Sequence, residues 1–351
     1  MKPGKGLFVL VILLIQVLGL VTVWSTAPDL FVSQLSFVIA GIILVFLLSQ
    51  VDLDLLFSVS WFFYFLSVFL LLLTAVIGRD IRGSVRWIDL GFFNLQTSEI
   101  IKPFLAIFYS SYLSLNPLRS LKSFYIFLFL ALVPVALVIR QPDLGSALIL
   151  LLLPLSLLAF TGHLKRLFIL GIASLVVFVP LEARLLKPYQ RQRIESFINP
   201  YKDPQGAGYN VIQATIAVGS GGFLGRGVRL GTQSQLNYLP ERHTDFIFAS
   251  FAEEFGLVGM TVLLFAYYFL LSKILQVSTL VKHKSHALLS LSVFFILFFQ
   301  AVVNIGMNLG IMPVTGITLP LVSYGGSSLL SFALLFGLTL RLLDAVRPFE
   351  V

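Results

Sequence analysis

Cysteine is absent from this chain of 351 residues, and charged side chains are scarce. Without cysteine the protein has no disulfide bonds and no thiolate chemistry. Asp, Glu, Lys and Arg together make up 11% of the residues, whereas soluble domains contain roughly 25%. This shortage of charge predicts a membrane protein.

Histidine is also rare, and the chain contains four: His163, His243, His283 and His286. A metal site built mainly from histidine is therefore disfavoured. The formal net charge of +8 suits contact with anionic lipid surfaces or phosphate-bearing substrates. No nucleic acid partner is expected, because the basic residues are scattered over short loops and form no single patch.

Hydrophobic residues make up 58% of the chain, and its mean hydropathy is +0.98. They recur in runs long enough to cross a hydrocarbon core of roughly 30 Å. These runs predict an all-α polytopic membrane protein with about ten transmembrane helices. The expected spans are residues 7–25, 31–49, 56–78, 99–115, 121–140, 145–161, 166–183, 246–272, 286–308 and 326–344. The first is predicted to be an uncleaved helix, since it is too long for a signal peptide and lacks a cleavage site.

The whole chain, 1–351, is expected to form one transmembrane domain. An even number of spans places both termini on one side of the membrane. Three short loops on that same side, residues 116–122, 162–166 and 273–284, are rich in Lys and Arg. The positive-inside rule therefore places these loops and both termini in the cytoplasm.

Two connections are then expected on the outer side. Residues 78–96 combine aromatic side chains typical of the membrane interface with arginines that run against the positive-inside rule. These arginines are Arg79, Arg82 and Arg86. The long extracellular loop, about 184–245, far exceeds typical connections and alternates apolar and polar residues through 209–219. We expect it to fold onto the membrane surface as short amphipathic helices.

The densest group of ionisable side chains lies where that long loop meets an apolar helix. Asp245 directly follows Arg242, His243 and Thr244 and precedes the run Phe-Ile-Phe-Ala. A carboxylate at a water–membrane boundary, backed by these side chains, can accept a proton or hold a metal ion. The alternative is that the segment only anchors its helix at the level of the lipid headgroups.

Glu99 and Lys102 stand three residues apart near the start of the fourth span, and so share one helix face. Ionisable residues inside a membrane are costly unless they are paired, and they often mark a functional site. The pair can therefore form a charged wall of a substrate cavity. It can also be an interfacial salt bridge with no further role.

A glycine-rich stretch at 219–227 could cradle a phosphate through its backbone N–H groups. It follows no predicted strand, so it is not a dinucleotide or P-loop fingerprint. The upstream cations Lys187, Arg191, Arg193 and Lys202 match the geometry and charge of phosphate. The alternatives are a flexible turn and nonspecific contact between the cations and lipid headgroups.

Two further segments bear on the bundle. Asp143 is placed to cap the N-terminus of the sixth span. Residues 313–328 contain two prolines, several glycines and hydroxyl side chains, which do not form a plain lipid-facing helix. Irregular backbone at membrane depth is tolerated where it is buried in protein or lines a cavity. This stretch is therefore predicted to form a cavity wall.

Six segments in this order resemble the SEDS family (shape, elongation, division and sporulation) of membrane glycosyltransferases that polymerise peptidoglycan. They are Gln-Thr-Ser-Glu-Ile-Ile-Lys (96–102), Gln-Pro-Asp-Leu-Gly (141–145), Asn-Pro-Tyr-Lys-Asp-Pro-Gln-Gly-Ala-Gly-Tyr (199–209), Ala-Val-Gly-Ser-Gly-Gly (217–222), Leu-Pro-Glu-Arg-His-Thr-Asp-Phe-Ile-Phe (239–248) and the stretch 313–328. Pro-Val-Thr-Gly at 313–316 is more similar to the elongation branch than to the division branch, which usually has lysine third. Thr97 stands where the family commonly has proline.

The resemblance implies that lipid II is polymerised into glycan strands at the outer face of the bacterial cytoplasmic membrane. Asp245 matches the family's catalytic aspartate and is the expected base or metal ligand. The expected substrate-binding residues are Glu99, Lys102, His243 and Thr244, with Lys187, Arg191 and Arg193 as candidates for the pyrophosphate leaving group. The resemblance also implies a divalent metal ion, Mg or Mn, without an organic cofactor, and a class B penicillin-binding protein as crosslinking partner.

A helical bundle with a polar cavity is equally typical of a lipid II flippase or transporter. A purely structural scaffold for the wall-synthesis machinery is a third reading of the same features. A transporter more naturally places its charges near the membrane midplane. The acid at an outer loop–membrane boundary therefore favours the enzyme.

Overall fold

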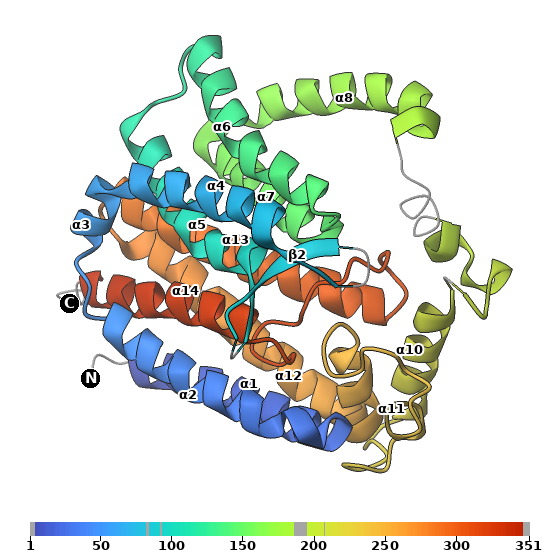
Figure 1. Ribbon diagram of the computed structural model, residues 1–351. Coiled ribbons are helices and arrows are strands. Elements are labelled where there is room, and N and C mark those ends of the chain that lie inside the picture. Colours follow the sequence, from blue (N-terminus) through green and yellow to red (C-terminus); the bar gives the residue numbers. More distant parts are fainter. Residues whose placement is uncertain (1–3, 82–83, 92, 186–194, 207, 347–351) are drawn as a thin grey trace.

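Long apolar runs become helices because backbone polar groups inside a bilayer must be paired within their own segment. The computed structural model describes residues 4–81, 84–91, 93–185, 195–206 and 208–346. Its long helices lie roughly side by side (Figure 1). They are α1 (Lys5–Thr26), α2 (Phe31–Leu48), α4 (Ser60–Ile77), α5 (Thr97–Leu115), α6 (Leu121–Arg140), α7 (Leu144–Leu158), α8 (Leu164–Leu185), α12 (Ile247–Leu280), α13 (Lys284–Asn308) and α14 (Gly326–Ala345).

Each predicted span coincides with one of these helices, and the protein is an integral membrane protein. Eight helical stretches in the described part of the chain are long and apolar enough to cross a membrane. One of them, Leu144–Ser174, runs from α7 into α8. Helix α5 is not among the eight. The expected number of spans, about ten, therefore stays a prediction.

Helix α5 is less apolar than its neighbours because it lies inside the bundle. It packs against α4, α13, α14 and α7, and most of its side chains are buried. A helix surrounded by other helices meets little lipid, so its polar residues can pair with protein groups. The aromatic side chains of Phe108 and Tyr109 extend the buried core on this helix.

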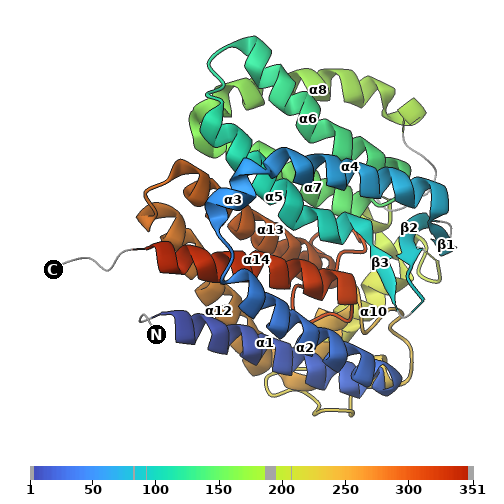
Figure 2. The same cartoon turned by 60° about the vertical axis from the view of Figure 1, so that its left-hand side comes forward.

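Both ends of the chain belong to one end of the bundle. Lys5 at the start of α1 forms an ion pair with Asp344 near the end of α14, and Figures 1 and 2 show the N- and C-terminal helices leaving on that side. The short helix α3 (Leu53–Ser58) lies at the same end.

The opposite end carries a small sheet that the sequence did not predict. Strands β1 (Arg79–Ile81), β2 (Ser84–Asp89) and β3 (Asn94–Gln96) are antiparallel in the order β1-β2-β3. Trp87 pairs with Gln96 in the register of β2 and β3. Arg79 and Asp89 form an ion pair at 2.6 Å. The connection predicted to lie at the membrane interface is thus an ordered platform beside the helix ends (Figure 2).

The described part of the long loop folds at this same end. The predicted amphipathic segment is helix α10 (Tyr209–Ser220), which packs against α12. Shorter elements in the chain are η1 (Pro28–Leu30), the π-helical turn η2 (Ala159–His163), η3 (Pro200–Lys202) and α11 (Thr232–Gln235).

The glycine-rich stretch packs against α12, which occupies two of its N–H groups, and phosphate binding by the rest of the stretch stays a prediction. The N–H groups of Arg226 and Gly227 donate to the carbonyls of Glu253 and Glu254 in α12, at 2.9 and 3.0 Å. The helix is interrupted here at Gly256, whose φ is 63°. Because these N–H groups are already bonded, they are not available to hold an anion.

Candidate active site

A cavity of about 600 Å³ opens at the sheet end of the bundle. It is walled by the start of α2, the sheet, the end of the long loop and the irregular stretch before α14. The lining residues are Ser33, Phe37, Arg86, Trp87, Phe93, Asn94, Gln96, Glu241, Thr244, Asp245, Gly316, Thr318, Tyr324, Gly325, Gly326, Ser327 and Ser328. The prediction that 313–328 forms a cavity wall is confirmed.

Asp245 lies on this wall, just before the start of α12. Its backbone carbonyl accepts hydrogen bonds from the side-chain amides of Asn304 and Asn308, at 2.9 and 3.0 Å. Both asparagines are fully buried on α13. A Cβ atom at Gly316 would lie 3.5 Å from Oδ2 of Asp245. The carboxylate therefore lies next to the irregular stretch at ordinary contact distance, and glycine suits this position because its φ is 75°.

The turn before Asp245 is clamped to the irregular stretch. Ser323 Oγ donates to the carbonyl of Thr244 at 2.7 Å, and the backbone N–H of Tyr324 donates to the carbonyl of His243 at 2.9 Å. The side chain of Thr244 donates to the Glu241 carboxylate at 3.2 Å. These bonds fix the turn, and with it Asp245, against the cavity floor.

Arg86 is a cavity residue that the sequence analysis missed. It lies on β2, donates to the carbonyl of Pro142, and stands 3.7 Å from Oδ1 of Asp143. Asp143 caps α7 as predicted, accepting from the N–H of Ser146 at 3.2 Å. Arg86 could have been found by its sequence context, because an arginine on an outer loop runs against the positive-inside rule.

Glu99 and Lys102 form the ion pair that their spacing predicts, with Lys102 Nζ 2.5 Å from Glu99 Oε1. Both are buried and neither lines the cavity. Lys102 also donates to Gln300 at 2.9 Å, and Gln300 donates to the backbone of Thr318, a lining residue. The pair therefore supports the cavity wall from beneath, and its contact with substrate stays a prediction.

The remaining predicted site residues are placed as follows. Thr244 lines the cavity beside Asp245. His243 faces a smaller neighbouring cavity of about 410 Å³, and its ring meets that of Tyr324 edge-on with centroids 5.9 Å apart. Lys187, Arg191 and Arg193 lie outside the described residues.

Comparison with known proteins gives the family. Residues 5–347 match the family model of the FtsW, RodA and SpoVE cell cycle proteins. This chain belongs to the FtsW/RodA/SpoVE family. It is 36% identical over 338 residues to the peptidoglycan glycosyltransferase MrdB of Escherichia coli K12, covering 95% of this chain and 91% of the relative. A probable peptidoglycan glycosyltransferase FtsW of Francisella salina is 34% identical over 302 residues, covering 82% and 75%.

Solved structures of the FtsW/RodA/SpoVE family share the fold. One match is a chain of a peptidoglycan synthase complex in which polymerization and crosslinking are structurally coordinated. Its TM-score is 0.84 and its identity 36%, and the match covers 97% of this chain and 98% of that one. The rod shape determining protein RodA of Thermus thermophilus matches with a TM-score of 0.73 and 30% identity, covering 97% of each.

Two acids on α12, Glu253 and Glu254, have structural roles. Glu253 is fully buried and accepts from the backbone N–H groups of Gln233 and Ser234, at 2.8 and 3.0 Å. Glu254 accepts from the N–H of Arg229 at 3.2 Å. Neither lines the cavity. They fasten the long loop to α12, so Asp245 and Glu241 are the acids on the cavity wall.

Few carboxylates on the cavity wall are available to bind the predicted metal ion. Among the described residues no group of three or more His, Cys, Asp or Glu is arranged to hold a metal. Asp245 and Glu241 nevertheless share one cavity wall. Mg²⁺ is commonly held by one or two carboxylates together with substrate phosphates, so this pair fits a metal that arrives with a pyrophosphate substrate.

Proposed function

We propose that this chain, which is a peptidoglycan glycosyltransferase, polymerises lipid II into glycan strands at the outer face of the bacterial cytoplasmic membrane during cell elongation. The observation that carries the proposal is the position of Asp245. Its carboxylate stands on the wall of an open, polar cavity, and its backbone is held by two buried asparagines.

The proposed reaction makes use of this placement. A sugar hydroxyl of the acceptor lipid II attacks the anomeric carbon of the growing strand, so that a C–O bond forms. The bond from that carbon to the pyrophosphate oxygen breaks, undecaprenyl pyrophosphate leaves, and the anomeric centre is inverted. Asp245 takes the proton of the attacking hydroxyl. General base catalysis of this kind contributes about 10²–10⁴-fold to a rate.

The leaving pyrophosphate needs positive charge. Arg86 faces the same cavity as Asp245, and a guanidinium matches phosphate geometry well. Lys187, Arg191 and Arg193 remain proposed contributors from the long loop. A divalent metal held by Asp245 and Glu241 would add positive charge beside the pyrophosphate oxygens.

The distribution of Lys and Arg supports a cavity that faces outside the cell. The short loops rich in Lys and Arg belong to the end of the bundle that carries both termini, and the positive-inside rule assigns that end to the cytoplasm. The sheet belongs to the opposite end (Figure 1), and Asp245 lines the cavity that residues of this sheet also line. Lipid-linked sugars at the outer membrane face would then meet the catalytic carboxylate directly.

A class B penicillin-binding protein is the proposed partner. Support comes from the similarity to a chain of a peptidoglycan synthase complex that coordinates polymerization and crosslinking. This protein has little mass outside its helices to guide a long polysaccharide, so we expect the partner to raise its polymerisation rate. An unchanged rate on adding the partner would count against this assignment.

The proposed function is tested with purified protein and lipid II. Asp245→Asn keeps the size of the side chain but removes the base, so we expect nearly all glycan-strand formation to be lost while the melting temperature is kept. Glu254→Gln is the matched control, a neutralised acid on α12 that does not line the cavity, and is expected to retain most of the activity.

Each outcome of this test has a clear meaning. Near-normal product from Asp245→Asn would remove Asp245 from the mechanism. A wild-type protein that binds lipid II but forms no strands would favour a flippase. Transport itself is not observed in this assay, because detergent-solubilised protein has no second compartment to transport into.

A further inference from the structure

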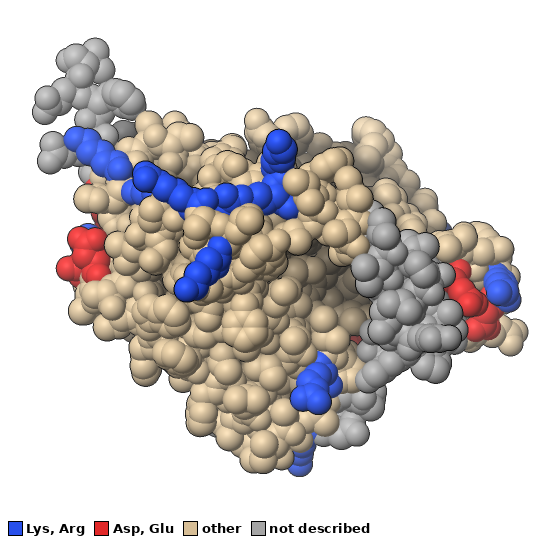
Figure 3. Space-filling model, turned by 90° about the horizontal axis from the view of Figure 1, so that it is seen from above, with Lys and Arg blue, Asp and Glu red and all other residues tan. Residues whose placement is uncertain are grey.

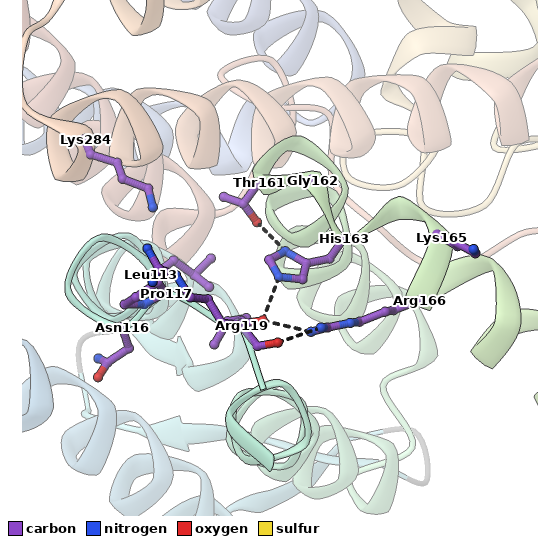
Figure 4. Close-up of a pocket in the computed structure, with 11 residues that line it drawn as sticks. Leu113, Asn116, Pro117, Arg119, Thr161, Gly162, His163, Lys165, Arg166 and Lys284 are labelled. Carbon is purple, nitrogen blue, oxygen red and sulfur yellow. Dashed lines mark hydrogen bonds between the residues drawn. The ribbon is translucent and has the colours of Figure 1, made fainter. Parts of the chain in front are cut away.

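A second cavity, of about 410 Å³, lies between the loop from α5 to α6, the bend between α7 and α8, and the start of α13. Figure 4 shows the side chains around it. The lining residues are Leu113, Asn116, Pro117, Leu118, Arg119, Thr161, Gly162, His163, Lys165, Arg166 and Lys284. Four of them are Lys or Arg and none is acidic. The cavity is formed by the short basic loops at the end of the bundle assigned to the cytoplasm.

The walls of this basic cavity are fixed by hydrogen bonds. The guanidinium of Arg166 donates to the carbonyls of Leu118 and Arg119, both at 2.8 Å. His163 Nε2 lies 3.0 Å from the same Leu118 carbonyl. Gly162 makes the bend possible with a φ of 90°. Arg166 and His163 therefore bind the bend between α7 and α8 to the loop between α5 and α6, and these two segments together form the cavity wall.

The other three cations of the basic cavity have no protein partner. Arg119, Lys165 and Lys284 are exposed, and within the described part of the chain their side chains form no hydrogen bond or ion pair. In Figure 4 the ammonium group of Lys284 points from the start of α13 toward the loop of Asn116 and Arg119. Lys284 also stands at a helix N-terminus, where the helix dipole favours an anion.

The sequence supplies no counterion close along the chain. Residues 100–142, 144–181 and 255–343, which contain all the walls of the basic cavity, hold no Asp or Glu. Figure 3 looks down on the α6 and α8 side of the molecule and shows Lys and Arg side chains gathered on the half that leads to the termini. Asp54 lies 3.8 Å from His286 in the first turn of α13, but no Asp or Glu lines the cavity itself, so its cations favour an anion from outside the protein.

Apolar side chains beside the basic cavity indicate what carries that anion. Leu115, Leu121 and Leu164 flank the cavity walls in sequence and are 74%, 62% and 66% exposed. Phe160 on the bend and Phe168 near the start of α8 are 61% and 69% exposed. These side chains meet lipid in an integral membrane protein, so a bound anion has hydrocarbon next to it. A free phosphate or a nucleotide would leave this apolar surface unused.

We propose that the basic cavity binds the phosphate headgroup of an anionic glycerophospholipid. Arg119 and Lys284 contact the phosphate, Lys165 adds positive charge at the rim, and the acyl chains lie against the flanking leucines and phenylalanines. Basic pockets between transmembrane helices on the cytoplasmic side are known to suit such headgroups. The bound lipid would fasten the α5–α6 loop to α13.

Lipid retention by the purified full-length protein tests this assignment, measured by native mass spectrometry. We expect wild type to retain dioleoylphosphatidylglycerol and not dioleoylphosphatidylcholine. Binding should weaken about fivefold for each cation removed and about 25-fold in Arg119→Gln/Lys284→Gln. The control Lys273→Gln/Lys282→Gln removes the same charge from the same end without touching the cavity, and should bind as wild type does.

Three results would overturn the proposal. Equal phosphatidylglycerol retention by the Arg119/Lys284 variant and wild type would exclude these side chains. An equal loss in the control variant would mean that total charge, and not this cavity, binds the lipid. Displacement of the lipid by inorganic phosphate, with the same dependence on Arg119 and Lys284, would identify a soluble phosphate compound as the ligand. The melting temperature without lipid, expected to be unchanged in both variants, shows that each is folded.

Discussion

Two buried asparagines on α13 hold the backbone of Asp245, the proposed catalytic aspartate. Asn304 donates both to the carbonyl of Asp245 and to that of Ile317, at 2.9 and 2.6 Å. It therefore fastens the loop–helix boundary to the irregular stretch on the other side of the cavity. Orientation of a reacting group can decide several orders of magnitude in rate, so polar residues that never touch substrate still matter at this scale.

The ion pair of Glu99 and Lys102 gives a second prediction at the residue scale. Removing one partner leaves a charge uncompensated in the protein interior, which costs about 3–5 kcal/mol. We expect Glu99→Ala and Lys102→Ala each to lower stability and activity, and the double variant to lose less than the sum. Thermal unfolding and strand synthesis from lipid II measure both effects.

The control for this cycle is the exposed pair of Glu195 and Lys202, which are 3.4 Å apart. Breaking an exposed pair changes stability by about 0–1 kcal/mol, so Lys202→Ala should shift the melting temperature very little. Strictly additive losses at Glu99 and Lys102 would show that the two residues do not couple.

At the scale of elements, the break in α12 receives the glycine-rich stretch of the long loop. Leu257 and Val258 donate backbone hydrogen bonds to the carbonyls of Gly222 and Phe223, at 2.9 and 3.1 Å. The same stretch is bound to the carbonyls of Glu253 and Glu254. Helix and loop thus form one unit, and this unit leads directly to Asp245.

Gly256→Ala tests that unit. A Cβ at Gly256 would lie 2.2 Å from the backbone nitrogen of Gly225, and the backbone conformation there, with φ at 63° and ψ at −162°, is one that only glycine adopts readily. We expect a loss of about 1–3 kcal/mol from backbone strain alone, seen as a lower melting temperature and faster proteolysis of the long loop.

The matched control is Gly171→Ala on α8, where a Cβ would meet no atom within 4 Å. Alanine favours a helix over glycine by about 1 kcal/mol, so this variant should be at least as stable as wild type. Equal melting temperatures for Gly256→Ala and wild type would refute the close approach of loop and helix.

On the scale of the whole molecule, the two ends of the bundle differ in chemistry. The sheet end presents a cavity with Asp245 and Glu241 on its wall. The end with the termini presents a cavity lined by four Lys and Arg side chains. This polarity suits a protein that meets lipid-linked sugars on one membrane face and anionic lipid on the other.

Cysteine labelling tests this orientation, because the chain has no cysteine of its own. Gln205 and Lys282 are exposed at opposite ends of the molecule. Gln205→Cys should react with an impermeant thiol reagent added to intact cells, and Lys282→Cys should react only after the membrane is opened. The reverse pattern would invert the topology and place Asp245 in the cytoplasm.

The sequence by itself determined the class of the protein, its helices and the catalytic candidate. Scarce charge and long apolar runs are local properties, and in a bilayer they leave the helix as the available structure. The pairing of Glu99 with Lys102 and the cap at Asp143 also followed from the sequence, because both depend on spacing within one helix or its first turn.

Only the tertiary structure decided what surrounds Asp245. Asn304 and Asn308 lie about 60 residues further along the chain, and Arg86 reaches the cavity from a sheet that the sequence did not predict. In the glycine-rich stretch, the N–H groups of Arg226 and Gly227 turned out to be bonded to α12. Such contacts depend on the direction of each side chain and on the packing of distant helices, and no spacing along one segment encodes them.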